Sequence, residues 1–124
     1  MVRKNRGQFG RVILVCGGRT YADRKRVFEV LGLLRAQSPI GLVIQGGARG
    51  ADALGLAWAQ SRGIQYLTFH AEWGKYGRSA GPRRNAQMLS QGPDLVVAFP
   101  GGKGTADMIA KARAAGVEVL KVKA

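Results

Sequence analysis

Three short stretches of the chain pair glycines with basic or hydroxyl side chains, a combination that is typical of anion binding. They are GGRT at residues 17–20, GGARGAD at 46–52 and PGGKGT at 100–105. Glycine leaves backbone N–H groups accessible to a ligand, and the start of a following helix adds partial positive charge. Together, the three stretches predict a site for a phosphate group.

These stretches differ from the two common phosphate-binding loops. In PGGKGT, Gly104 separates Lys103 from Thr105, so the adjacent Gly-Lys-Ser/Thr of a P-loop is missing. The first stretch continues as GGRTYA and lacks the GxGxxG fingerprint of dinucleotide-binding domains. The pattern therefore excludes an ordinary P-loop ATPase and an ordinary dehydrogenase.

Few side chains could act as a general acid or base, since the chain has seven Asp and Glu residues and one His. Glu72 is the first candidate for acid–base chemistry and Asp52 a weaker one, because Asp52 is equally well placed to cap a helix. His70 lies close by in the sequence but has no evident partner. One Cys and one His are too few for a Cys/His zinc site, so we predict neither a metal nor a cofactor.

Five apolar runs are the elements that must position the glycine loops. They are RVILVC (11–16), IGLVIQ (40–45), IQYLTF (64–69), DLVVAF (94–99) and VEVLKV (117–122). The first, second and fourth runs are apolar on both faces, as in buried strands of a parallel sheet, and each leads into a glycine pair. The last run alternates more, which is typical of an edge strand.

The segments between these runs have the periodicity of amphipathic helices. They lie within residues 23–39, 51–63, 82–92 and 105–116. Asp23 is the predicted N-cap of the first helix, and Gly63 and Gly116 are the predicted end points of the second and the fourth. Trp58 lies on an apolar helix face and is predicted to be in the core. Residues 70–81 show neither period and are predicted to form a long exposed loop.

This alternation of strands and helices predicts an α/β fold. We expect a Rossmann-like, doubly wound, mainly parallel sheet of about five strands flanked by helices. In such sheets, ligands bind outside the carboxyl ends of the strands, where the strand order reverses. The three glycine loops should therefore meet at one edge of the sheet.

Composition limits the domain organisation and the class of partner. The chain has 124 residues, 46% of them hydrophobic, which predicts a single domain over residues 11–124 after a flexible basic arm at 1–10. Its 20 Lys and Arg against 7 Asp and Glu favour an anionic partner. No apolar stretch is long enough for a signal peptide or a membrane span, and Cys16 is alone in an apolar run. These features predict a cytoplasmic protein with no membrane partner.

The motifs resemble those of the SLOG superfamily of Rossmann-like domains, in particular its small YspA-type family. The resemblance is carried by GGR, GGARGAD, GPRRNAQM and PGGKGTADM and covers about residues 11–122. PGGxGT together with an upstream RNxxM is its most specific part. Relatives include LOG phosphoribohydrolases, molybdenum-cofactor carrier proteins, DNA-processing proteins and sensors of NAD-derived signals. The resemblance implies a pocket for a nucleotide-like molecule and, because relatives often form dimers or tetramers, a homo-oligomer.

The site residues that the resemblance implies include one important departure. It implies that Arg84 faces the phosphate loop, and Asn85 stands where LOG enzymes have a lysine. Met108 stands where LOG enzymes have a glutamate that assists cleavage of the glycosidic bond, and a methionine has no such chemistry. The nearest acid, Asp107, would serve only if its helix were rotated, so LOG-type hydrolysis is disfavoured.

We predict a single ligand-binding set from the loops and the resemblance together. Trp73 and Tyr76 would either stack on a base or pack their loop against the domain. Asp52 would either contact a ribose hydroxyl or cap its helix. The predicted set is Gly17, Gly18, Arg19, Gly46, Gly47, Ala48, Arg49, Asp52, Trp73, Arg84, Asn85, Pro100, Gly101, Gly102, Lys103, Gly104 and Thr105.

Three functions are consistent with the sequence. The leading one is binding of a phosphorylated, nucleotide-derived ligand, such as an ADP-ribose-like or NAD-derived molecule, to sense, sequester or carry it. The second is a nucleotide phosphoribohydrolase that uses Glu72, Asp52 or Asp107. The third is single-stranded nucleic-acid binding, which the net charge of +13 supports and the scarcity of aromatic residues, at 7%, opposes.

Overall fold

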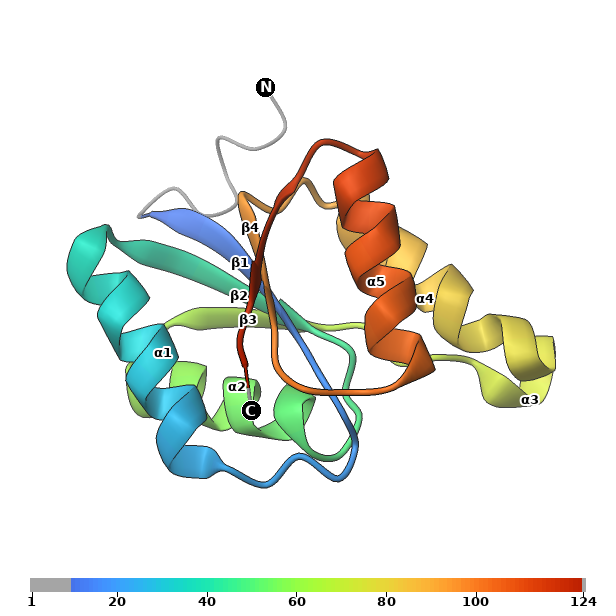
Figure 1. The fold of residues 1–124 in the computed structure, drawn as a ribbon, viewed down its shortest axis with the longest axis horizontal. Coiled ribbons are helices and arrows are strands. Elements are labelled where there is room, and N and C mark those ends of the chain that lie inside the picture. The colour runs from blue at the N-terminus through green and yellow to red at the C-terminus, as the bar shows by residue number, and fades with distance from the viewer. Residues whose placement is uncertain (1–9, 124) are drawn as a thin grey trace.

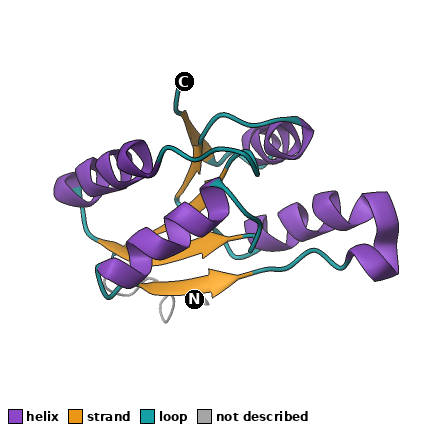
Figure 2. Cartoon of the chain, turned by 90° about the horizontal axis from the view of Figure 1, so that it is seen from below, coloured by secondary structure: helices purple, strands orange, loops and turns teal. Residues whose placement is uncertain are grey.

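The computed structural model describes residues 10–123, which form one parallel sheet between two layers of helices (Figures 1 and 2). Its strands are β1 (Arg11–Cys16), β2 (Ile40–Gln45), β3 (Gln65–Thr68), β4 (Leu95–Ala98) and β5 (Glu118–Lys121). They lie in the order β3-β2-β1-β4-β5, and every pairing is parallel. The predicted α/β class and the edge position of β5 are confirmed. Most of the predicted N-terminal arm lies outside the described residues.

The helices largely follow the predicted amphipathic segments. They are α1 (Arg24–Gln37), α2 (Ala51–Ser61), α3 (Trp73–Tyr76), α4 (Ala80–Leu89) and α5 (Lys103–Ala114). The predicted cap of α1 is confirmed, because the carboxylate of Asp23 accepts a hydrogen bond of 3.0 Å from the backbone N–H of Arg26. Gly63 and Gly116 follow the ends of α2 and α5 with φ of +65° and +76°, as predicted for residues that end a helix.

The prediction of a long loop over residues 70–81 was wrong. This segment contains α3, a 3-10 turn at Gly77–Ser79 and the start of α4. The N–H groups of Lys75 and Tyr76 both donate to the carbonyl oxygen of Glu72 at 3.0 Å, so α3 is a single turn. One turn is too short for a hydrophobic period to show in the sequence.

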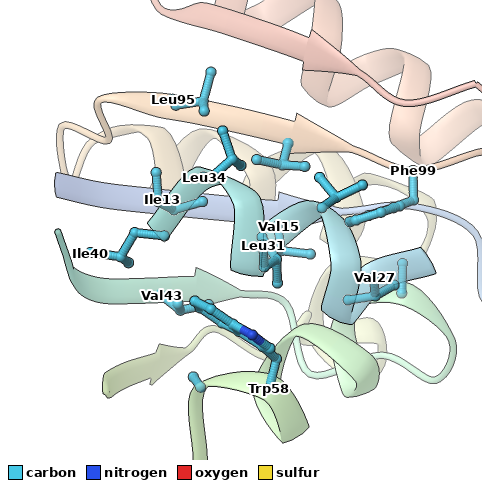
Figure 3. Close-up of a cluster of buried hydrophobic side chains, with 14 of the residues drawn as sticks. Ile13, Val15, Val27, Leu31, Leu34, Ile40, Val43, Trp58, Leu95 and Phe99 are labelled. Atoms are coloured by element: carbon cyan, nitrogen blue, oxygen red, sulfur yellow. The ribbon is translucent and has the colours of Figure 1, made fainter. Parts of the chain in front are cut away.

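Each face of the sheet packs on one pair of helices. On one face, α1 and α2 bury side chains from β1, β2 and β4, as Figure 3 shows for Ile13, Val43 and Leu95. Trp58 of α2 is fully buried in this layer, which confirms its predicted core position. On the other face, α4 and α5 pack against the opposite side chains of the same strands, with Met108 fully buried. The helix layers thereby fix how α4 and α5 approach the end of the sheet.

The strand order reverses between β1 and β4. From β1 the chain crosses to β2 and β3 on one side, whereas β4 and β5 lie on the other. The loops after β1 and β4 are joined by a hydrogen bond of 2.9 Å from the N–H of Gly18 to the carbonyl of Pro100. The N–H of Ala51, at the start of α2, donates to the carbonyl of Gly18 at 3.1 Å. All three glycine loops therefore converge where a ligand site is expected.

Within residues 10–123, no helix has the length and apolar character needed to cross a membrane. The same residues contain no cluster of three or more His, Cys, Asp or Glu side chains able to hold a metal ion.

Candidate functional site

A cavity of about 480 Å³ opens at the end of β1, between the glycine loops and α4. This volume is within the range of small-molecule sites in proteins. Its lining residues are Cys16, Gly17, Gly18, Arg19, Ala48, Asp52, Trp73, Arg78, Gly81, Pro82, Arg84, Asn85, Met88, Gly102, Lys103, Gly104 and Thr105. We call this space the main cavity.

Several predicted site residues do not line the main cavity. Gly46, Gly47 and Arg49 line a smaller cavity that adjoins it. Pro100 and Gly101 line spaces on the far side of their loop, towards β5 and α1. Glu72 is exposed beside α3 and lines neither cavity.

Most of the loop glycines serve packing within the protein, which corrects the interpretation that all of them make room for an anion. Close neighbours occupy the space of a side chain at Gly17, Gly18, Gly46, Gly47, Gly50 and Gly101. At Gly46, for example, a Cβ atom would collide with the guanidinium of Arg84 and lie 2.9 Å from a carboxylate oxygen of Asp52. Among the described glycines, only Gly102 and Gly104 have no atom within 4 Å of a Cβ position and also line the main cavity.

The start of α5 is the part of the main cavity best suited to a phosphate group. Gly102 is the N-cap residue, and no side chain caps the helix. The N–H groups of the first helical turn have no partner inside the helix, and the helix dipole adds partial positive charge. Lys103 is exposed at this point, and Gly104 leaves the backbone bare. An anion at this position would meet both a cation and free N–H groups.

Arg84 projects from α4 into the floor of the main cavity. Its Nη1 atom donates to the carbonyl of Gly46 at 2.7 Å, and its Nε atom donates to Oδ1 of Asn85 at 3.2 Å. Burial lowers the pKa of Arg84, while the charge of Asp52 acts in the opposite direction. An arginine stays protonated under such conditions. These hydrogen bonds, together with a longer one of 3.4 Å from Nη1 to the carbonyl of Phe69, fix the guanidinium in place and leave other N–H groups for a ligand.

Asn85 joins α4 to α5 and holds Asp107 away from the main cavity. Its side-chain amide donates to the carbonyl of Gly104 at 3.2 Å and to Oδ2 of Asp107 at 3.0 Å. Lys111 donates to the other carboxylate oxygen at 2.5 Å. Burial tends to raise the pKa of Asp107, but the hydrogen bonds from Lys111 and Asn85 lower it overall. Asp107 does not line the main cavity, and Met108 beside it packs in the core.

Asp52 is the acidic residue that lines the main cavity in the described part of the chain. It does not cap α2, whose N-cap is Gly50; instead it accepts a hydrogen bond from the N–H of Ala48 at 3.2 Å. Only 6% of Asp52 is exposed, and this burial raises its pKa, although the Ala48 N–H and the charge of Arg84 oppose the shift. Burial, and then the charge of Asp52, raise the pKa of the neighbouring Cys16 thiol to about 12. Cys16 is therefore an unreactive part of the floor.

The raised pKa of Asp52 predicts a specific pH dependence of stability. The native state retains this proton to a higher pH than the unfolded chain does, so Asp52 should lower stability as pH rises above its ordinary value of 3.8. Relative to the wild type, Asp52→Asn should therefore gain in free energy of unfolding as pH rises above about 4. Urea unfolding at a series of pH values measures this difference.

Asp107→Asn is the matched control, because the pKa of Asp107 is lowered in the native state. Folding favours its ionised form. The free energy of unfolding of the wild type should therefore rise relative to that of this variant as pH rises through the acid range, and lose this advantage as pH falls. If the difference in free energy of unfolding from the wild type changed with pH in the same direction for both variants, the assignment of Asp52 as a buried carboxylate whose ionised form is disfavoured would be contradicted.

Aromatic and basic side chains gather beside the mouth of the main cavity. The sequence analysis assigned Trp73 and Arg19 to the site but did not predict this grouping. Trp73 is 48% exposed, and the Arg19 guanidinium lies 5.3 Å from the centre of its ring. Lys75 and Arg83 lie 5.0 and 4.3 Å from the ring of Tyr76. The alternation in WGKYGRSAGPRR was the available signal, and the short helices bring these side chains together.

Comparison with known proteins adds two findings. The family model described as the YspA, cpYpsA-related SLOG family matches residues 11–76, which include β1 to β3 and the first two glycine loops. The Gene 61 protein of Mycobacterium phage D29 is 36% identical to the chain over 118 residues, an alignment that covers 89% of the chain and 94% of that protein. No solved structure matches the chain at a significant level.

Proposed function

Because the chain belongs to the YspA, cpYpsA-related SLOG family, we propose that it binds a phosphorylated, nucleotide-derived small molecule in the main cavity. Family membership suggests a nucleotide-related ligand that is either bound or processed. Binding is the function that the arrangement of charges supports best. We place this activity in the cytosol, as the sequence predicts, with an ADP-ribose-like or NAD-derived molecule as the ligand class.

The observation that carries the proposal is the imbalance of charge around the cavity. Arg19, Arg78, Arg84 and Lys103 all line it. They face one carboxylate, that of Asp52, whose pKa is raised. Charge-assisted hydrogen bonds from arginine match the geometry of phosphate oxygens, and the bare start of α5 adds backbone donors. Such a site is suited to an anion of small-molecule size.

Residues of the main cavity are also placed to contact the base and the ribose of a nucleotide. Trp73 lies at the mouth with about half of its surface exposed, so a base can stack on its ring. Asp52 lies deeper, where its carboxylate can accept a hydrogen bond from a ribose hydroxyl. The phosphate would then lie between Arg84 and the first turn of α5.

Isothermal titration calorimetry with AMP, ADP-ribose and adenosine tests the proposal. We expect AMP and ADP-ribose to bind and adenosine, which has no phosphate, to bind at least tenfold more weakly. Affinity should fall only shallowly with salt, because a single small ligand neutralises few cations. Equal affinity for adenosine and AMP would contradict the proposal. Tighter binding of a single-stranded oligonucleotide, with a steep salt dependence, would favour the nucleic-acid function instead.

Hydrolysis of the bound nucleotide is a second candidate, supported by the position of Asp52. This carboxylate lines the cavity and has a raised pKa, which is typical of a general acid or base. If the chain is a hydrolase, chromatography should detect free base released from AMP or ADP-ribose, and Asp52→Asn should stop the release while binding remains. No release by the wild type over several hours would leave binding as the function.

A further inference from the structure

A second cavity, of about 310 Å³, adjoins the main cavity. The two share four lining residues, which are Arg19, Ala48, Trp73 and Arg84. The two arginines therefore form part of both cavities, and a ligand bound in one lies next to the other. We call the smaller space the side cavity.

The polar side chains that line the side cavity are those of three arginines and a histidine, and none of the described residues that line it is acidic; Ala48, Ala71 and Trp73 are its apolar lining residues. Besides the shared arginines, it contains Arg49 and His70, together with backbone from Gly46 and Gly47. A sugar would require acceptors for its hydroxyl groups, and these side chains offer few. An apolar group would have to displace water from three guanidinium groups. The chemistry of the walls therefore selects an anionic group.

The walls of the side cavity are held in place by partly buried hydrogen bonds. Gln45 is fully buried; its amide nitrogen donates to the Thr68 hydroxyl, and its amide oxygen accepts from the N–H of Gly47 at 2.7 Å. The imidazole of His70 lies directly against Gly47, where a Cβ atom would be 2.5 Å from its Nδ1. Arg84 bonds the carbonyl of Gly46 from the other side. This loop is thus fixed before any ligand arrives, which lowers the entropic cost of binding.

From these observations we propose that the side cavity is a second anion subsite and that the ligand carries two phosphoryl groups, one in each cavity. This inference rests on the proposed function of the main cavity. One phosphoryl group binds at the start of α5 near Lys103, and the other binds to Arg49 beside His70. Arg19 and Arg84 lie between them and contact both. The ligand class is a diphosphorylated nucleotide rather than a nucleoside monophosphate.

Calorimetry with three adenosine nucleotides tests this subsite. The probes are AMP, adenosine 5′-diphosphate and adenosine 3′,5′-bisphosphate. We expect the better of the two diphosphorylated probes to bind at least tenfold more tightly than AMP, as one added charge-assisted contact predicts. If that probe is the 5′-diphosphate, both phosphoryl groups lie on one chain; if it is the 3′,5′-bisphosphate, the ribose spans the cavities.

Arg49→Ala distinguishes the contributions of the two cavities to affinity, because Arg49 lines the side cavity and not the main one. It should remove the gain from the second phosphoryl group and leave AMP affinity within about twofold. Arg113→Ala is the matched control: Arg113 is exposed in the last turn of α5 and lines neither cavity, so its loss should change neither affinity.

Each remaining outcome decides against the inference in a recognisable way. Equal affinity for all three probes, or an equal loss for all three in Arg49→Ala, would overturn the second subsite while leaving nucleotide binding in the main cavity intact. Failure of every probe to bind, AMP included, would overturn the proposed function and the subsite with it.

Discussion

Replacing Arg84 with alanine is expected to weaken AMP binding roughly 10- to 100-fold. Arg84 lines both cavities, and its guanidinium is fixed by Gly46 and Asn85 with N–H groups left for the ligand. A hydrogen bond between charged groups contributes about 1.5–3 kcal/mol, and about 1.4 kcal/mol corresponds to a factor of ten in affinity. Calorimetry on the purified variant measures the effect.

Loss of Arg84 would also remove the larger of the two positive charges that act on the buried carboxylate of Asp52, the other being Arg19. A loss of binding could therefore reflect a damaged fold. The double variant Arg84→Ala/Asp52→Asn separates the two effects. It should recover much of the stability that Arg84→Ala loses at neutral pH, because no uncompensated charge remains buried. Its affinity for AMP should stay low. Recovery of affinity in the double variant would show that Arg84 acts through Asp52 and does not contact the ligand.

Gly50→Ala is expected to destabilise the fold by roughly 2–6 kcal/mol, the largest effect on stability that we predict. Gly50 has φ of +78° and ψ of −129°, a backbone conformation open almost only to glycine and costing about 1–3 kcal/mol for other residues. A Cβ atom there would also collide with the carbonyl of Gly18 and lie 2.7 Å from that of Arg19. Overpacking of this kind costs a further 1–3 kcal/mol or so. Urea unfolding followed by circular dichroism gives the difference.

Gly63→Ala provides the comparison for this variant. Gly63 also has a positive φ, of +65°, but no atom lies within 4 Å of its Cβ position. The same substitution should therefore cost only about 1–2 kcal/mol, the backbone part alone. A loss at Gly50 no larger than that at Gly63 would contradict the close packing of the loops after β1 and β2.

The glycine loops show which features a local sequence pattern predicts and which depend on long-range contacts. Paired glycines after three apolar runs predicted the edge of the sheet at which the loops meet, because the carboxyl ends of parallel strands share one edge. The pattern could not distinguish Gly46, which accommodates Arg84 from 38 residues further along the chain, from Gly104, which faces open space. Both residues are glycine in the sequence, and they differ only in the atoms that lie next to them in the folded protein.

The three acidic candidates for catalysis could likewise not be distinguished from the sequence alone. Glu72, Asp52 and Asp107 were predicted as alternatives, because their spacing along the chain does not show which one faces the cavity. Helix rotation and partners from other elements separate them: Asp52 lines the cavity, Asn85 and Lys111 hold Asp107, and Glu72 is exposed. These contacts join residues that are not neighbours in the sequence, so no local periodicity encodes them.

The sequence by itself determined the α/β class, the parallel sheet with β5 at its edge, the cap of α1, the end points of α2 and α5, and the three glycine loops that meet at one edge of the sheet. Hydrophobic periodicity reports burial of each segment in turn, and glycine and capping residues report local backbone conformation. The tertiary structure alone decided which side chains line the two cavities, that short helices replace the predicted loop at residues 70–81, and that Arg19 and Arg84 serve both cavities. Those features depend on distances through space between separate elements, and such distances are set only when the helix layers pack on the sheet.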